Sequence, residues 1–154
     1  MGPRFLLDGM LGRLCRKMRM LGLDCEMACG GRSPWFLTDA ENAGRTPVTT
    51  ATRSVDRCGP PPVILRLSGQ AEMIAELFTK LGMIPEFAPF TICLECNSPL
   101  REISAEKIGN RVPPRILQDF KEFHECSGCG RVYWKGSHYD AMERQVERIL
   151  ARVK

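Results

Sequence analysis

Residues 4–22 read Arg-Phe-Leu-Leu-Asp-Gly-Met-Leu-Gly-Arg-Leu-Cys-Arg-Lys-Met-Arg-Met-Leu-Gly and combine the pattern of a strand with that of a helix. The apolar run 5–7 ends in the carboxylate of Asp8, which is typical of a buried strand whose carboxyl end opens onto a site. From Met10 to Leu21 the apolar residues recur at helical spacing, and Gly22 is a typical helix end. The stretch therefore predicts a strand followed directly by a helix.

The same alternation continues along the first half of the chain. Further strands are expected at Leu23–Met27, Pro47–Thr50 and Val63–Leu67, and further helices at Trp35–Ala43 and Gln70–Leu81. Strands that alternate with helices in so short a span predict a small α/β layer with a parallel sheet. Pro85–Pro89 breaks this pattern. We therefore predict a first domain over residues 1–88 and a second over residues 89–154.

Four of the eight cysteines form two Cys-x-x-Cys pairs: Cys93, Cys96, Cys126 and Cys129. A structural Zn²⁺ binds four thiolates in a tetrahedron at about 2.3 Å, and a two-residue spacer lets one tight turn present two sulfurs. Asn97 and Gly130 follow the pairs, and both types tolerate the positive φ of such a turn. We predict a zinc ribbon with an insertion between its pairs; disulfides or a dithiol redox centre are the alternatives.

The other cysteines are scattered through the first half of the chain: Cys15, Cys25, Cys29 and Cys58. Lone cysteines usually pack as small buried hydrophobic side chains. We therefore predict four core thiols here. Beyond residue 88, strands are expected at Pro99–Ser104 and Arg131–Trp134, and helices from Pro113 to near Phe120 and over His138–Val153.

The composition is that of a soluble globular chain. The 154 residues are 44% hydrophobic, 26% charged and 7% aromatic, with a formal net charge of +4. No apolar run reaches the roughly 18 residues that a membrane span needs, and the first residues lack the apolar core of a signal peptide. We therefore expect an intracellular protein, cytoplasmic or nuclear, with no membrane segment.

Six motifs follow one another along the chain. The first half contains Phe-Leu-Leu-Asp at 5–8, Met-Leu-Gly-Arg-Leu at 10–14 and Met-Arg-Met-Leu-Gly-Leu-Asp at 18–24. The second half contains Cys-Leu-Glu-Cys-Asn-Ser-Pro-Leu at 93–100, Val-Pro-Pro-Arg at 112–115 and Phe-His-Glu-Cys-Ser-Gly-Cys-Gly-Arg-Val-Tyr-Trp-Lys-Gly-Ser-His at 123–138. This series resembles the Mut-seven C-terminal RNase-domain family from about residue 4 to 150. The resemblance implies a PIN-like three-layer α/β nuclease domain and a four-cysteine zinc ribbon that act on or bind RNA.

The resemblance also implies a catalytic site of clustered carboxylates that hold one or two Mg²⁺ or Mn²⁺ ions, which activate water against a phosphodiester. Asp8 matches the first acidic position of the family. Gly9 follows it in place of a second acid, and an ungapped count puts Ser33 or Pro34, and then Ala51, at two further acidic positions. One carboxylate cannot position a hard divalent ion. A shifted alignment could recruit Asp24, Glu26, Asp39 or Asp56.

Two sets of basic residues are candidates for nucleic-acid binding: Arg13, Arg16 and Lys17 with Arg19 nearby on the first helix, and Arg131 and Lys135 in the ribbon. Cations in a row can follow phosphates, and Tyr133 and Trp134 could stack on bases. The alternatives are a solvated helix face and aromatic rings that pack beneath the zinc. Three functions follow: an active metal-dependent ribonuclease, an RNA-binding module with a decayed nuclease site, and a protein-interaction domain.

Overall fold

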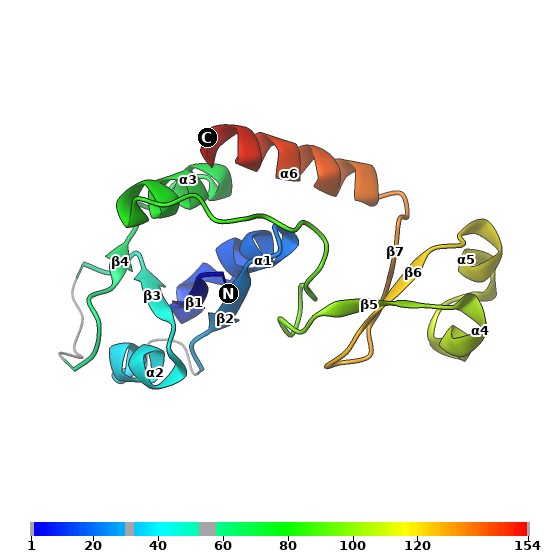
Figure 1. Cartoon of the computed structure of the whole chain (residues 1–154), viewed down its shortest axis with the longest axis horizontal. Helices are drawn as coiled ribbons and strands as arrows, with labels where there is room; N and C mark the ends of the chain where they lie inside the picture. Colours follow the sequence, from blue (N-terminus) through cyan, green and yellow to red (C-terminus); the bar gives the residue numbers. More distant parts are fainter. Residues whose placement is uncertain (1, 30–32, 53–57, 154) are drawn as a thin grey trace.

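The computed structural model describes residues 2–29, 33–52 and 58–153, and Figure 1 shows their arrangement. The chain first forms a parallel sheet covered by helices and then a small antiparallel sheet to one side of it. The C-terminal helix runs back over the first part. Within the described ranges, no helix is long and apolar enough to cross a membrane.

Four parallel strands form the main sheet in the order β2-β1-β3-β4. Their bounds are Arg4–Leu7 for β1, Asp24–Met27 for β2, Thr46–Thr49 for β3 and Val63–Ile64 for β4. Side chains alternate along a strand, so Phe5 and Leu7 of β1 enter one core and Leu6 enters another. The predicted parallel sheet is confirmed, although β4 is shorter than the predicted strand 63–67.

Helices cover both faces of this sheet. They are the 3-10 helix η1 (Gly9–Leu11) and the α-helices α1 (Gly12–Met20), α2 (Phe36–Ala43) and α3 (Gln70–Leu81). α1 and α3 pack on the face of Phe5, and α2 packs on the face of Leu6. The connection from β1 runs outward to β2 and the next one returns to β3, so right-handed crossovers place α1 and α2 on opposite faces. The three predicted layers are therefore confirmed.

The second part is a three-stranded antiparallel sheet in the order β5-β6-β7. The strands are β5 (Leu100–Ile103), β6 (Phe123–Cys126) and β7 (Val132–Trp134). The predicted insertion is confirmed: between β5 and β6 the chain forms α4 (Ala105–Ile108), η2 (Gly109–Arg111) and α5 (Pro114–Asp119). A small core of Ile108, Val112 and Phe123 joins this insertion to the sheet.

The last helix, α6 (Tyr139–Val153), leaves the small sheet and packs on the helices of the first part (Figure 1). Val146, Ile149 and Val153 are buried in the same core as Phe5 and Leu7. The predicted division at residue 88 therefore separates two chain segments that share one hydrophobic core. By its packing, α6 belongs with α1 and α3 rather than with the antiparallel sheet.

Candidate metal centre and nucleic-acid interface

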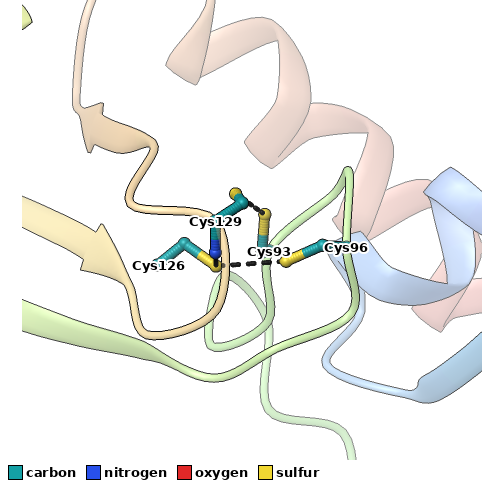
Figure 2. A group of neighbouring side chains, drawn as sticks. All are labelled: Cys93, Cys96, Cys126 and Cys129. Carbon is teal, nitrogen blue, oxygen red and sulfur yellow. Dashed lines mark hydrogen bonds between the residues drawn. The ribbon is translucent and has the colours of Figure 1, made fainter.

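The four paired cysteines meet at one point, as Figure 2 shows. Their sulfur atoms all lie within 4.8 Å of one another. The Sγ atoms of Cys93 and Cys129 are 3.7 Å apart, and those of Cys96 and Cys126 are 3.2 Å apart. A tetrahedron with metal–sulfur bonds of about 2.3 Å has sulfurs about 3.8 Å apart, so the donor set fits Zn²⁺. It is the only group of three or more metal-ligating side chains in the described part of the chain.

The two cysteine pairs sit on turns of the same construction. In each turn the first cysteine's carbonyl oxygen accepts a hydrogen bond from the residue that follows the pair, 3.1 Å from Asn97 N and 3.0 Å from Gly130 N. These two residues have φ angles of +66° and +73°. The positive φ predicted from their residue types is therefore confirmed. Such turns aim two sulfurs at one point.

The environment of the sulfurs acts on their ionisation in different ways. Hydrogen bonds from Ser98 lower the pKa of Cys96 to about 6, whereas burial raises the pKa of Cys126 to about 11. Burial opposes ionisation of Cys93, but hydrogen bonds from Tyr133 and the backbone outweigh it and lower its pKa. Zn²⁺ binds thiolates, so metal binding at this site releases protons.

The aromatic side chains of the ribbon, Tyr133 and Trp134, both make contacts within the second part of the structure. The hydroxyl of Tyr133 lies 3.1 Å from Cys93 Sγ, and the Trp134 side chain packs against the core of the insertion. Both are half-buried. Tyr133 thus supports a metal turn, as the alternative interpretation expected, whereas Trp134 supports the small core rather than the metal site.

Arg19 ties the first metal turn to the α/β part. Its guanidinium is buried and donates to the carbonyl oxygens of Cys25 at 2.8 Å, Leu94 at 3.0 Å and Glu95 at 2.8 Å. Arg19 therefore does not lie on the exposed basic face beside which it was predicted. The helical spacing could have indicated this burial, because Arg19 follows the buried Cys15 by four residues and therefore lies on the same face of α1.

Asn97 makes a second connection between the two parts. Its Oδ1 accepts from Cys25 N at 2.9 Å, and its Nδ2 donates to Asp24 Oδ1 at 2.6 Å. Asp24 also binds the buried Arg45, which reaches Glu26 as well. The zinc turn is therefore fixed to the edge strand β2 by a polar network that sequence reasoning missed.

Asp8 stands at the carboxyl end of β1, next to β3. Its Oδ2 accepts a hydrogen bond of 2.9 Å from the Thr49 hydroxyl, and its Oδ1 accepts one of 3.3 Å from Met10 N. The connections after β1 and β3 diverge here, and ligand sites of open α/β sheets lie at such points. Asp8 also caps η1, which is the structural role considered for it, and its catalytic role stays a prediction.

The other carboxylates do not complete an acidic cluster in the described residues. Asp24 and Glu26 bind Arg45. Asp24 stands at the amino end of β2, whereas Asp8 follows the carboxyl end of the parallel strand β1. Asp39 lies in the first turn of α2 and interacts with Ser33 at 3.5 Å. Asp56 lies outside the described residues. This donor set does not fit Mg²⁺ or Mn²⁺, which need several oxygen ligands at one point.

The predicted basic face of α1 is partly engaged. Arg13 is exposed, Arg16 pairs with Glu95 at 2.5 Å, and Lys17 donates to Gln145 of α6. Burial and, to a smaller extent, the nearby charge of Arg16 lower the pKa of Lys17.

In the ribbon, Arg131 is exposed, and Lys135 pairs with Glu122 at 3.3 Å and lies over the Tyr139 ring. The structure thus brings Arg13, Arg16 and Lys17 together, and it keeps the ribbon residues apart from Asp8 on a different sheet.

The first-half cysteines are of two kinds. Cys15 and Cys25 are buried in the main core, with their sulfurs 3.2 Å apart. Cys29 and Cys58 are exposed. The prediction of four core thiols is therefore wrong for the latter two, because they lie in the segments that follow β2 and precede β4 rather than on a packed face.

Together, the fold and the site define an α/β domain of three layers that carries a zinc-ribbon-like sheet with four grouped cysteines. The chain matches the family described as the Mut7-C RNAse domain over residues 3–146. The match covers most of the chain, and the chain belongs to this family. No significant match was found among curated proteins, and none among solved structures.

Proposed function

We propose that this chain binds single-stranded RNA on the exposed face of α1, beside the edge of the sheet where Asp8 stands. Membership of an RNase-domain family supports a nucleic acid as the ligand. The observation that carries the proposal is the position of Arg13, an exposed cation in the first turn of α1, directly after the 3-10 helix that Asp8 caps.

The charges of this face support contact with phosphates. Arg13 has no ion pair or side-chain hydrogen bond among the described residues. The Arg16–Glu95 pair joins two exposed side chains, and such pairs contribute little in water. A phosphate can therefore compete with Glu95 for Arg16. In the ribbon, Arg131 and Lys135 provide two further exposed cations.

The four-cysteine centre has a structural role in this proposal. The first cysteine turn is fixed to α1 and β2 through Arg19 and Asn97, so Zn²⁺ bound to both turns holds the ribbon against the α/β part. A four-thiolate zinc site has no open position for substrate, so it takes no part in chemistry. The zinc thus fixes where the ribbon cations stand.

Metal-dependent hydrolysis of RNA is the second candidate function. It is favoured by Asp8 at the carboxyl end of β1 and by Asp39 in the first turn of α2, the helix that starts from the same edge of the sheet. Two carboxylates without a third partner do not make a divalent-ion site. We therefore favour RNA binding over RNA cleavage as the function of this chain.

One experiment separates these functions. Labelled single-stranded RNA is incubated with the zinc-loaded protein and Mn²⁺, and binding is followed by anisotropy from about 50 to about 200 mM salt. Salt-sensitive binding without cleavage supports the binding module. Cleavage that is lost in Asp8→Asn and Asp39→Asn supports the enzyme. Neither binding nor cleavage would leave the protein-interaction function.

A further inference from the structure

The charged residues of α6 are separated onto two flanks. Each residue advances about 100° around a helix, so Arg144 and Arg148 follow one another on the flank that holds Gln145. Glu143 and Glu147 follow one another on the opposite flank. All four charged side chains are exposed. α6 therefore presents a basic side and an acidic side to solvent.

Contacts identify which way each flank faces. Lys17 of α1 donates a hydrogen bond to Gln145, so the arginine flank borders α1. Lys135 of the ribbon lies over the ring of Tyr139, and Glu143 follows Tyr139 by one helical turn, so the acidic flank turns toward the small sheet. Figure 1 shows α6 running over α1 on its way from the ribbon. The basic side of α6 therefore adjoins the basic face of α1.

The two helices run in opposite directions. Phe90 N donates a 3.0 Å hydrogen bond to the carbonyl oxygen of Met20, at the end of α1. The Phe90 ring packs on Tyr139, the first residue of α6, with centroids 4.9 Å apart. The end of α1 thus lies near the start of α6. Arg13 lies about one turn before Lys17 on α1, and Arg148 lies about one turn after Gln145 on α6, so both extend away from this contact on the side remote from the ribbon.

These arginines lack acidic partners. Arg13, Arg144 and Arg148 have no ion pair or side-chain hydrogen bond with any described residue. Arg152, the next arginine of α6, differs because it pairs with Glu72 of α3 at 2.9 Å. A row of unpaired, exposed cations drawn from two helices is an environment that a polyanion stabilises.

We infer that α1 and α6 form one phosphate-binding surface, made of Arg13, Lys17, Arg144 and Arg148. This surface binds a single RNA strand. The inference rests on the proposed function, namely that this chain binds RNA. The surface runs along both helices from the ribbon toward η1, so it leads the strand to the edge where Asp8 stands. α6 packs mainly on α3, and its contact with α1 through Lys17 and Gln145 brings the basic residues of both helices into one RNA site.

The test compares two paired variants of the zinc-loaded full chain. In Arg144→Gln/Arg148→Gln the basic flank is neutralised, and in Glu143→Gln/Glu147→Gln the acidic flank of the same helix is. Binding of labelled single-stranded RNA is measured over a salt series. Each phosphate contact on a single strand adds about 0.7 to the salt slope, hence about fivefold in affinity at about 0.1 M salt. The arginine variant should bind about 25-fold more weakly, with a slope smaller by about 1.4.

The outcomes are distinct. A weaker affinity and smaller slope for the arginine variant, with at most a slight change for the glutamate variant, supports the surface. If the wild-type chain binds RNA and the arginine variant binds equally well, this inference fails while the proposed function stands. Opposite shifts of equal size in the two variants would mean a response to net charge alone and would also overturn it. Absence of RNA binding by the wild type overturns both, and binding to phosphatidylserine vesicles alone would identify a membrane surface instead.

Discussion

The guanidinium Nη1 of Arg19, at the end of α1, donates a 2.8 Å hydrogen bond to the carbonyl oxygen of Glu95, inside the first cysteine turn. The same nitrogen reaches the Leu94 carbonyl at 3.0 Å. The backbone that presents Cys93 and Cys96 is thus held by a buried side chain of the α/β part. Stability of the fold and order of the metal site are therefore coupled.

Replacing Arg19 should uncouple the two parts. Arg19→Ala leaves three carbonyl oxygens without their donor, and we expect a loss of about 2 to 4 kcal/mol in unfolding free energy. Arg19→Lys should recover only part of it, because an ammonium cannot reproduce the planar fork of donors. Urea unfolding of the zinc-loaded protein measures this. Arg13→Ala is the control and should change stability by about 0.5 kcal/mol or less; equal effects at the two positions would contradict the account.

Removal of the metal should affect the ribbon selectively. Metal analysis is expected to find about one Zn²⁺ per chain, lost in Cys96→Ser and retained in Cys29→Ser, whose cysteine is exposed and outside the cluster. After chelation, backbone amides of β5–β7 should exchange rapidly while those of β1 and β3 stay protected, because the ribbon's own core is small. A protein that folds normally without zinc would rule out the structural role.

Gly22 should not accept a side chain. Its φ is +79°, and an added Cβ would lie 2.0 Å from the carbonyl oxygen of Ala88, where the chain passes toward the first cysteine turn. The left-handed backbone alone costs an alanine about 1 to 2 kcal/mol, and the contact adds to it. Gly12→Ala is the matched control, since nothing lies within 4 Å of its added Cβ. Thermal unfolding should rank Gly22→Ala well below both wild type and control.

Ionisation of Asp24 should make the unfolding free energy depend on pH in the acidic range. Burial opposes its ionisation, but hydrogen bonds from Arg45 and Asn97 prevail and lower the pKa of its carboxyl. Its ionised form therefore stabilises the fold fully above the unfolded pKa of about 3.9, and this contribution is lost as the pH falls through the lower folded value. From about pH 5 to about pH 3, wild type should lose more stability than Asp24→Asn. Parallel unfolding curves for the two proteins would be inconsistent with this, since zinc release affects both alike.

Local patterns predicted much of the fold. The helix expected over Gln70–Leu81 has those bounds in the structure, since its apolar spacing and Gly82 mark it clearly. Strand β6 (Phe123–Cys126) was missed, because its middle residues are polar and only its ends are buried. The position of α6 was not predicted either, because the apolar spacing of an amphipathic helix does not indicate which hydrophobic core that helix covers.

Some residues of the candidate site could likewise be predicted from the sequence, and others could not. The cysteine ligands and the turn residues Asn97 and Gly130 were predictable, because zinc coordination fixes local spacing and backbone geometry. The sequence predicts Arg19 near the exposed face, whereas the structure buries it against Leu94, 75 residues further along the chain. Long-range contacts of this kind leave no local pattern in the sequence.

Binding of RNA to the exposed face of α1 can be measured in a salt series with a charge-matched control variant. The variant Arg13→Gln/Lys17→Gln is compared with Arg115→Gln/Lys121→Gln, which removes two exposed charges in the insertion before β6. We expect single-stranded RNA to bind the first variant about 25-fold more weakly at about 0.1 M salt, with a salt slope smaller by about 1.4, and to bind the second variant like wild type. Equal affinities for the two variants would contradict it.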